Sequence, residues 1–212
     1  MTSSPPPPER SDGRCAACAV PLDDGSCPNA ACRLPDREFS RIYTVSEDAE
    51  ETWELIYRFK YNEQKDLGEP LGRMLAEYLQ DNGAELERFD VLTPVALYIG
   101  PDAPRLWDYL QVILKAAQAV DDSWPFEDDV ITKVGVTGRF LGIGVEERRA
   151  IAEGELRSLL RVPNASRVEG KRVLVIDDAY SEGFTMREMA RTLRQAGAVE
   201  VAGLVLVRRK GA

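Results

Sequence analysis

The hydrophobic pattern near the C-terminus predicts a strand, a helix and a second strand in succession. Val173 to Ile176 are four consecutive apolar residues, rich in β-branched side chains and too few for a helix, which indicates a strand buried on both faces. Apolar side chains then recur at the i, i + 3, i + 4 and i + 7 positions of one helical face: Met186, Met189, Ala190 and Leu193. Val199 to Val207 form a second apolar strand, so we expect a βαβ unit with parallel strands.

Weaker patterns upstream predict further strands and helices. Residues 39–45 alternate enough to form a partly exposed strand, and residues 89–95 form another. Residues 51–60, 70–79 and 107–120 each carry an apolar stripe with helical spacing. Strands that alternate with helices in this way are typical of an α/β fold.

Two acids and a polar turn connect the strand at 173–176 to the helix that follows. Asp177 and Asp178 cannot extend a buried strand at low cost, so we expect them at its carboxyl end, where parallel sheets bind ligands. Gly183 permits a positive φ, and Thr185 with Glu188 fits the capping box that starts a helix. Backbone amides beside two carboxylates suit a phosphorylated ligand that carries hydroxyl groups. An ordinary turn with solvated acids is the alternative.

All four cysteines lie near the N-terminus in two pairs, Cys15-Ala-Ala-Cys18 and Cys27-Pro-Asn-Ala-Ala-Cys32. This spacing predicts a tetrahedral zinc site made of four thiolates. Disulfides are the alternative, and the lack of a visible secretory signal favours zinc. With no ligand position left open, we expect the zinc to be structural and to supply most of the folding energy of this segment.

Composition excludes several classes of function. The net charge of −9, from 36 acidic and 27 basic residues, disfavours a broad DNA-binding surface. The chain contains no histidine, which rules out Ser-His-Asp triads, Cys-His pairs and His-containing zinc sites. We find no apolar run of membrane-spanning length and no secretory leader, so we expect a cytoplasmic protein.

The run VLVIDDAYSEGFT resembles the phosphoribosyl-pyrophosphate (PRPP) motif of type I phosphoribosyltransferases, in which a hydrophobic strand leads into two acids, a hydroxyl-rich turn, a glycine and a final Ser or Thr. The resemblance implies that Asp177 and Asp178 are the catalytic acids, which hold the ribose hydroxyls. It also implies that the following loop wraps the 5′-phosphate. The substrate-binding residues that this implies are Ala179, Tyr180, Ser181, Glu182, Gly183, Phe184 and Thr185.

Two residues of the loop depart from the motif. Ala179 stands where a larger aliphatic residue is usual, and Glu182 stands where a second threonine is usual. A carboxylate aimed at a phosphate would repel it. Glu182 must therefore point away, be neutralised, or signal a changed ligand.

Nearly the whole chain past residue 12 is similar to the ComF-like, competence-associated phosphoribosyltransferases. The similarity rests on the cysteine set, a helix that ends in Phe-Lys-Tyr, a helix with Leu-Gly-Arg-Met-Leu, and the PRPP motif. It implies a mainly parallel, twisted sheet flanked by helices, with an N-terminal four-cysteine zinc knuckle. The expected division is a disordered, proline-rich tail at 1–12, the knuckle at 13–36 and a phosphoribosyltransferase-like domain at 37–212.

The middle of the chain matches this family poorly. Pro94 and Val95 end a strand that in the family leads into the pyrophosphate-binding loop, but the stretch after them contains a single arginine, Arg105. Residues 121–150 correspond to the hood that closes over the substrate. There we expect Arg139 to bind substrate, and Arg148 and Arg149 are further candidate cations for PRPP.

The sequence thus predicts a phosphoribosyltransferase that binds PRPP with Mg²⁺, releases pyrophosphate and transfers the phosphoribosyl group to a nucleobase-like acceptor. A catalytically weakened module that senses PRPP or a nucleotide, or that binds a partner, is the second hypothesis. A receiver-like signalling domain would also bind Mg²⁺ through two acids, but it would leave the glycine turn unexplained. Expected ligands are PRPP or a nucleoside monophosphate. We expect no membrane and no direct nucleic-acid contact, and a homodimer or a protein partner stays open.

Overall fold

The computed structural model describes residues 13–46, 49–104, 107–140 and 142–209. The predicted proline-rich tail and Arg105 lie outside these ranges. Within the described part of the chain, no helix has both the length and the apolar character that crossing a membrane would require.

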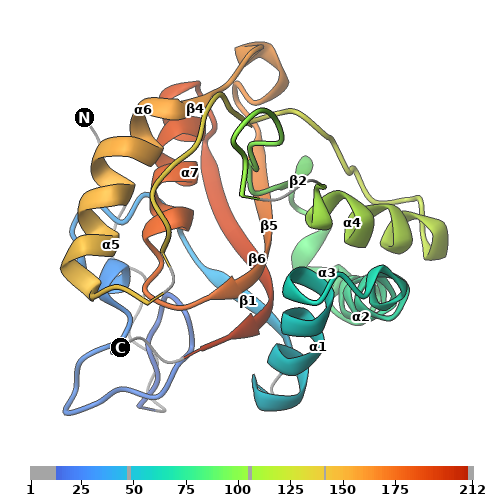
Figure 1. The fold of residues 1–212 in the computed structure, drawn as a ribbon, viewed down its shortest axis with the longest axis horizontal. Coiled ribbons are helices and arrows are strands. Elements are labelled where there is room, and N and C mark those ends of the chain that lie inside the picture. The colour runs from blue at the N-terminus through green and yellow to red at the C-terminus, as the bar shows by residue number, and fades with distance from the viewer. Residues whose placement is uncertain (1–12, 47–48, 105–106, 141, 210–212) are drawn as a thin grey trace.

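A parallel sheet of four strands in the order β1-β6-β5-β2 forms the centre of the molecule (Figure 1). Its strands are β1 (Ile42–Ser46), β2 (Val91–Pro94), β5 (Arg172–Tyr180) and β6 (Glu200–Arg208). A separate antiparallel pair consists of β3 (Thr132–Lys133) and β4 (Leu160–Arg161). The apolar run predicted as a buried strand lies in β5, where Val173 to Ile176 are at most 1% exposed.

Helices cover both faces of the sheet (Figure 1). One face carries α1 (Ala49–Tyr61), α2 (Gly68–Asp81), α3 (Gly83–Leu86) and α4 (Tyr109–Val120). The other face carries α5 (Val145–Ile151), α6 (Arg157–Leu159) and α7 (Phe184–Gln195). Shorter segments are the 3₁₀ helices η1 (Ala30–Arg33), η2 (Lys65–Leu67) and η4 (Ala165–Arg167), and the π-helical η3 (Ala152–Leu156). The predicted α/β fold, a parallel sheet flanked by helices, is confirmed.

The central βαβ unit forms as predicted, but its first strand is longer than the apolar run. β5 pairs with β6 from Arg172 to Tyr180, whereas β2 already ends with Pro94 opposite Ile176. The prediction that the two acids end the strand is therefore wrong, because the longer neighbour β6 carries β5 past them. Both acids follow the point where β2 stops pairing with β5. Beyond that point, none of the strands that the structure describes lies beside β5 on that side.

The predicted capping box at the start of the helix after the turn is also wrong. Helix α7 begins after Gly183, which has φ +85°, and no side chain caps it. Glu188 bonds Arg157 in place of the predicted capping box. Farther upstream, η3 and α6 continue α5, so the chain is helical as far as Leu159.

Candidate functional site

A cavity of 110 Å³ lies between the turn after β5 and the first residues of α7. A water molecule needs roughly 10–15 Å³ of such space, so a phosphate group would fit. Its lining contains all seven residues of the predicted loop, Ala179 to Thr185, and four further residues: Asp177, Met186, Phe140 and Arg148. Free backbone amides at the N-terminus of a helix attract anions, and α7 has 12 residues.

The turn requires glycine at position 183 for two reasons. Its φ of +85° is in the left-handed region that L side chains rarely adopt. A Cβ on Gly183 would also lie only 2.7 Å from Cζ of Tyr180. Tyr180 is 3% exposed, so it cannot simply move into solvent. The turn at Gly183 therefore packs directly against the buried ring of Tyr180.

The two acids have different environments. Asp178 is 3% exposed, and its Oδ2 accepts a hydrogen bond of 2.7 Å from Lys60 Nζ in α1. Its Oδ1 accepts a hydrogen bond from the Tyr109 hydroxyl at 3.1 Å. Burial raises the pKa of Asp178, but the charge of Lys60 and its hydrogen bond outweigh it and leave the pKa lowered. Burial and the neighbouring charge of Asp178 raise the pKa of the half-buried Asp177.

Lys60 is a site residue that the sequence reasoning did not single out. Its side chain is 9% exposed, and its Nζ lies 4.3 Å from the centroid of the Tyr109 ring. It lines the cleft beside Asp177 and Asp178. The sequence signal for Lys60 is its position between two aromatic residues, Phe59 and Tyr61, at the end of a helix.

Glu182 lines this cavity, but its carboxylate bonds the N-terminal segment. Its side-chain Oε2 accepts a hydrogen bond of 3.1 Å from the Ala30 amide, and its backbone oxygen accepts one of 2.8 Å from the Ala31 amide. These two amides open the 3₁₀ helix η1 of the cysteine-rich segment. The structure thus selects the first of the three possibilities for this departure from the motif: the carboxylate is directed toward the N-terminal segment.

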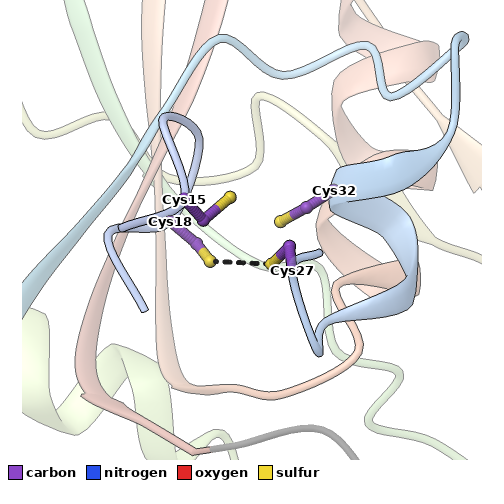
Figure 2. Close-up of side chains that lie close together, drawn as sticks. All are labelled: Cys15, Cys18, Cys27 and Cys32. Atoms are coloured by element: carbon purple, nitrogen blue, oxygen red, sulfur yellow. Dashed lines mark hydrogen bonds between the residues drawn. The ribbon is translucent and has the colours of Figure 1, made fainter. Parts of the chain in front are cut away.

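The four cysteines converge on one point (Figure 2). Cys15, Cys18, Cys27 and Cys32 are all buried with free thiols, and their sulfur atoms lie within 4.8 Å of one another. Tetrahedral zinc with bonds of about 2.3 Å places its sulfur ligands roughly 3.8 Å apart, so the donor set fits a structural metal ion. The predicted cluster is confirmed as a group of side chains that could hold a metal.

A tyrosine connects this cluster to the turn after β5. The Tyr180 hydroxyl lies 3.0 Å from the sulfur of Cys32. Burial, and secondarily Cys32, hold the pKa of Tyr180 well above its usual range, so the hydroxyl keeps its proton and can donate it to a thiolate. The cysteine cluster and the phosphate cavity are therefore joined by side chains that lie about 150 positions apart in sequence.

A larger cleft of 900 Å³ shares Asp177, Ser181 and Thr185 with the phosphate cavity. The predicted residues Val95 and Arg139 line it, whereas Pro94 is buried one residue before the lining begins. Other residues line the cleft from α1, from the segment after β2 and from the end of β6: Trp53, Tyr61, Tyr98, Trp107 and Arg209. The cleft thus combines a polar end at the turn with aromatic walls.

Arg148 is the cation that faces both cavities. It lies on α5, and its Nε is buried without a hydrogen-bond partner among the described residues. Arg149 beside it donates to Glu153 at 3.0 Å instead. An unpaired buried donor is costly in a folded protein, which favours a ligand at this position.

Comparison with known proteins agrees with this arrangement. Residues 122–212 match the phosphoribosyl transferase domain. DNA utilization protein YhgH of Escherichia coli K12 is 23% identical over 192 residues, covering 88% of this chain and 80% of YhgH. YhgH of Salmonella typhimurium LT2 is 22% identical over 190 residues, with the same coverage.

Solved structures give more distant similarities. A glutamine PRPP amidotransferase from B. subtilis is 29% identical, with a TM-score of 0.39, over 65% of this chain. The match spans only a quarter of the length of the amidotransferase. A purine phosphoribosyltransferase from Pyrococcus horikoshii is 13% identical, with a TM-score of 0.37, over 79% of this chain and 87% of its own. The domain match over the C-terminal part of the chain and the similarity to YhgH support its resemblance to ComF-like, type I phosphoribosyltransferase-like proteins.

Proposed function

We propose that the protein binds PRPP with Mg²⁺ and transfers its phosphoribosyl group to a nucleobase-like acceptor with release of pyrophosphate. The observation that carries this proposal is the 110 Å³ cavity at the N-terminus of α7, which Ser181, Thr185 and Asp177 line. A 5′-phosphate there would leave the ribose against the acids and the rest of the ligand in the larger cleft.

The chain's own groups suit this role mainly by position and charge. Asp177 faces the cleft and would orient the ribose hydroxyls, while Lys60 keeps Asp178 ionised beside it. Lys60, Lys133, Arg139 and Arg148 line the cleft and would offset the charge of the phosphates. The carboxylate of Asp177 is the group that would help to hold Mg²⁺ in the cleft, and the ion would supply positive charge for the leaving pyrophosphate. No step in this scheme needs a histidine.

The acceptor would occupy the aromatic part of the cleft. Trp53, Tyr61 and Trp107 offer flat apolar surfaces there, which suit a planar base. The name of the relatives, DNA utilization protein, is compatible with such an acceptor. A net charge of −9 disfavours DNA itself as the ligand.

Calorimetry with PRPP and Mg²⁺ tests the binding step, and two neighbouring arginines provide a matched comparison. Arg148→Gln is expected to weaken PRPP binding by about tenfold or more, because a charge-assisted contact to phosphate is lost. Arg149→Gln should change the affinity by less than about twofold, because Arg149 is engaged with Glu153 on the surface. Equal effects of the two variants would contradict the assignment of Arg148. No binding to the wild type, or binding that Asp178→Asn leaves unchanged, would contradict the proposed function.

We also propose that the cysteine cluster holds one structural zinc ion per chain. All four sulfur ligands are used, so the ion would have no open position for catalysis. Elemental analysis of protein purified without added metal is expected to give one zinc per chain, and Cys27→Ser is expected to lower that content sharply. Four thiols that react freely with a thiol reagent in the native protein would contradict this assignment.

A second candidate function is binding of PRPP or a nucleotide without turnover. The observation that favours it is that both carboxylate oxygens of Asp178 already accept hydrogen bonds, from Lys60 and Tyr109. An acid so engaged is less free to bind a ribose hydroxyl. Pyrophosphate release in the presence of a panel of bases separates the two functions, since a pure binding module would release none.

A further inference from the structure

We propose that Glu182 and Tyr180 couple the four-cysteine site to the phosphate cavity, so that metal binding at one and phosphate-ester binding at the other strengthen each other. That a phosphate ester binds in the cavity rests on the proposed function. That the two sites are connected rests on three contacts between the turn and the cysteine-rich segment.

The first two contacts are made by Glu182. It accepts hydrogen bonds from the amides of Ala30 and Ala31, one through its side chain and one through its backbone. Glu182 is 2% exposed, so little solvent is available to replace these bonds. Both bonds tie the turn that lines the cavity to the cysteine-rich segment. The backbone contact constrains the peptide that leads into Gly183.

The third contact runs through Tyr180. Its hydroxyl lies 3.0 Å from the Cys32 sulfur, and its ring is so close to Gly183 that a Cβ there would lie 2.7 Å from Tyr180 Cζ. A metal-bound Cys32 is a thiolate, which is a stronger hydrogen-bond acceptor than a thiol. Metal binding would therefore hold Tyr180 more firmly, and Tyr180 in turn supports the left-handed glycine of the turn.

The segment that Glu182 contacts, helix η1, depends on the metal for its own conformation. The helix η1 has only four residues, begins three residues after Cys27 and contains Cys32. A single 3₁₀ turn has little stability of its own. Without a metal to fix these two cysteines, the amides of Ala30 and Ala31 would no longer be held in place for Glu182. Loss of the ion would thus remove the hydrogen bonds that hold residues 180–183 against the cysteine-rich segment.

Linkage makes this coupling measurable in both directions. If the metal strengthens phosphate binding by some factor, the phosphate ester must strengthen metal binding by the same factor. Allosteric couplings commonly correspond to factors of about 5–150. We expect a factor of about ten here, since three contacts are involved.

The decisive measurement is zinc affinity, by competition with a chelating dye, with and without saturating ribose 5-phosphate. The wild type is expected to hold zinc about tenfold more tightly with the sugar phosphate present. Glu182→Thr and Tyr180→Phe should remove most of that difference, while Glu182→Gln, which keeps an acceptor oxygen, should restore part of it. The matched control is Asp90→Ala, because Asp90 also accepts from a backbone amide, that of Arg172, at the amino end of β5. Its coupling factor should equal that of the wild type.

Hydrogen exchange at the amides of residues 181–185 gives a readout that needs no ligand. Removing the metal from the wild type should speed exchange at these amides. Metal-loaded Glu182→Thr should show faster exchange there with its zinc still bound, which keeps the test valid even if the metal-free protein unfolds. Unchanged exchange in that variant, with equal zinc affinity in the presence and absence of sugar phosphate, would overturn the coupling. If the wild type binds neither ribose 5-phosphate nor PRPP, the proposed function fails, and the exchange experiment alone decides whether the two sites are connected.

Discussion

Replacing Lys60 with methionine is expected to lower the free energy of unfolding by about 3–5 kcal/mol, the usual cost of removing one partner of a buried ion pair. Lys60 Nζ lies 2.7 Å from Asp178 Oδ2, and the two side chains are 9% and 5% exposed. The variant would leave Asp178 buried without its cationic partner, although the Tyr109 hydroxyl would still donate to it. Denaturant unfolding followed by circular dichroism measures the change.

Two further variants separate the buried charge from the mere loss of a side chain. Adding Asp178→Asn to Lys60→Met should recover a substantial part of the stability, because the unpaired charge is then gone. Arg73→Met removes a cation from an exposed pair, in which Arg73 is 57% and Glu69 is 77% exposed. Its cost should stay below about 1 kcal/mol. A Lys60→Met variant as stable as Arg73→Met would contradict the importance of the buried pair.

The pH dependence of the Lys60→Met effect follows from the pKa of Asp178. Lys60 holds that pKa below its ordinary value. A carboxylate with a lowered pKa adds stability that is fully present above its unfolded pKa of about 4 and is lost as the pH falls through the folded value. The stability difference between wild type and variant should therefore shrink below about pH 4. A difference that stayed constant down to about pH 3 would point to packing instead of charge.

The Gly183→Ala variant is expected to abolish measurable PRPP binding and to destabilise the fold by at least about 1–2 kcal/mol, the cost of a left-handed conformation for an L residue. The added methyl group would also press on the ring of Tyr180, which is buried and contacts Cys32. Because the same turn carries Ser181 and Thr185, its displacement would change the lining of the phosphate cavity. Calorimetry with PRPP and thermal unfolding give the two readouts.

Gly170→Ala is the matched control for this variant. Gly170 also has a positive φ, +72°, but a Cβ there would meet nothing within 4 Å. Gly170→Ala should therefore lose only the stability that a left-handed conformation costs an alanine, and its PRPP affinity should be unchanged. If Gly183→Ala behaved like Gly170→Ala in both measurements, the turn would tolerate a side chain and the proposed phosphate site would be untenable.

Because of the contacts of Glu182, metal removal should affect the turn after β5 as well as the cysteine-rich segment. A zinc knuckle that only folded its own segment would leave the chemistry untouched until that segment unfolded. In this structure Glu182 and Tyr180 belong to the phosphate turn and bond the cysteine-rich segment directly. The departure from the PRPP motif at position 182 is therefore accounted for by a structural contact.

Several features could be predicted from the sequence because they are local. The apolar run of β5 indicates a buried strand, Gly183 indicates a left-handed turn, and the spacing of the four cysteines indicates a cluster. Each depends on residues that are close together in the chain, so propensity and spacing carry the information. The α/β fold follows from the order of such elements.

Only the tertiary structure decided the surroundings of the site. Lys60 meets Asp178 across 118 positions, and the Ala30 amide meets Glu182 across 152. No local pattern encodes such pairs, because they depend on which helix crosses which strand. The end of β5 was mispredicted for the same reason: its length is set by pairing with β6, which a run of apolar residues does not reveal. The sequence by itself determined the strand, the turn and the cysteine cluster, whereas long-range packing decided which charges and amides surround them.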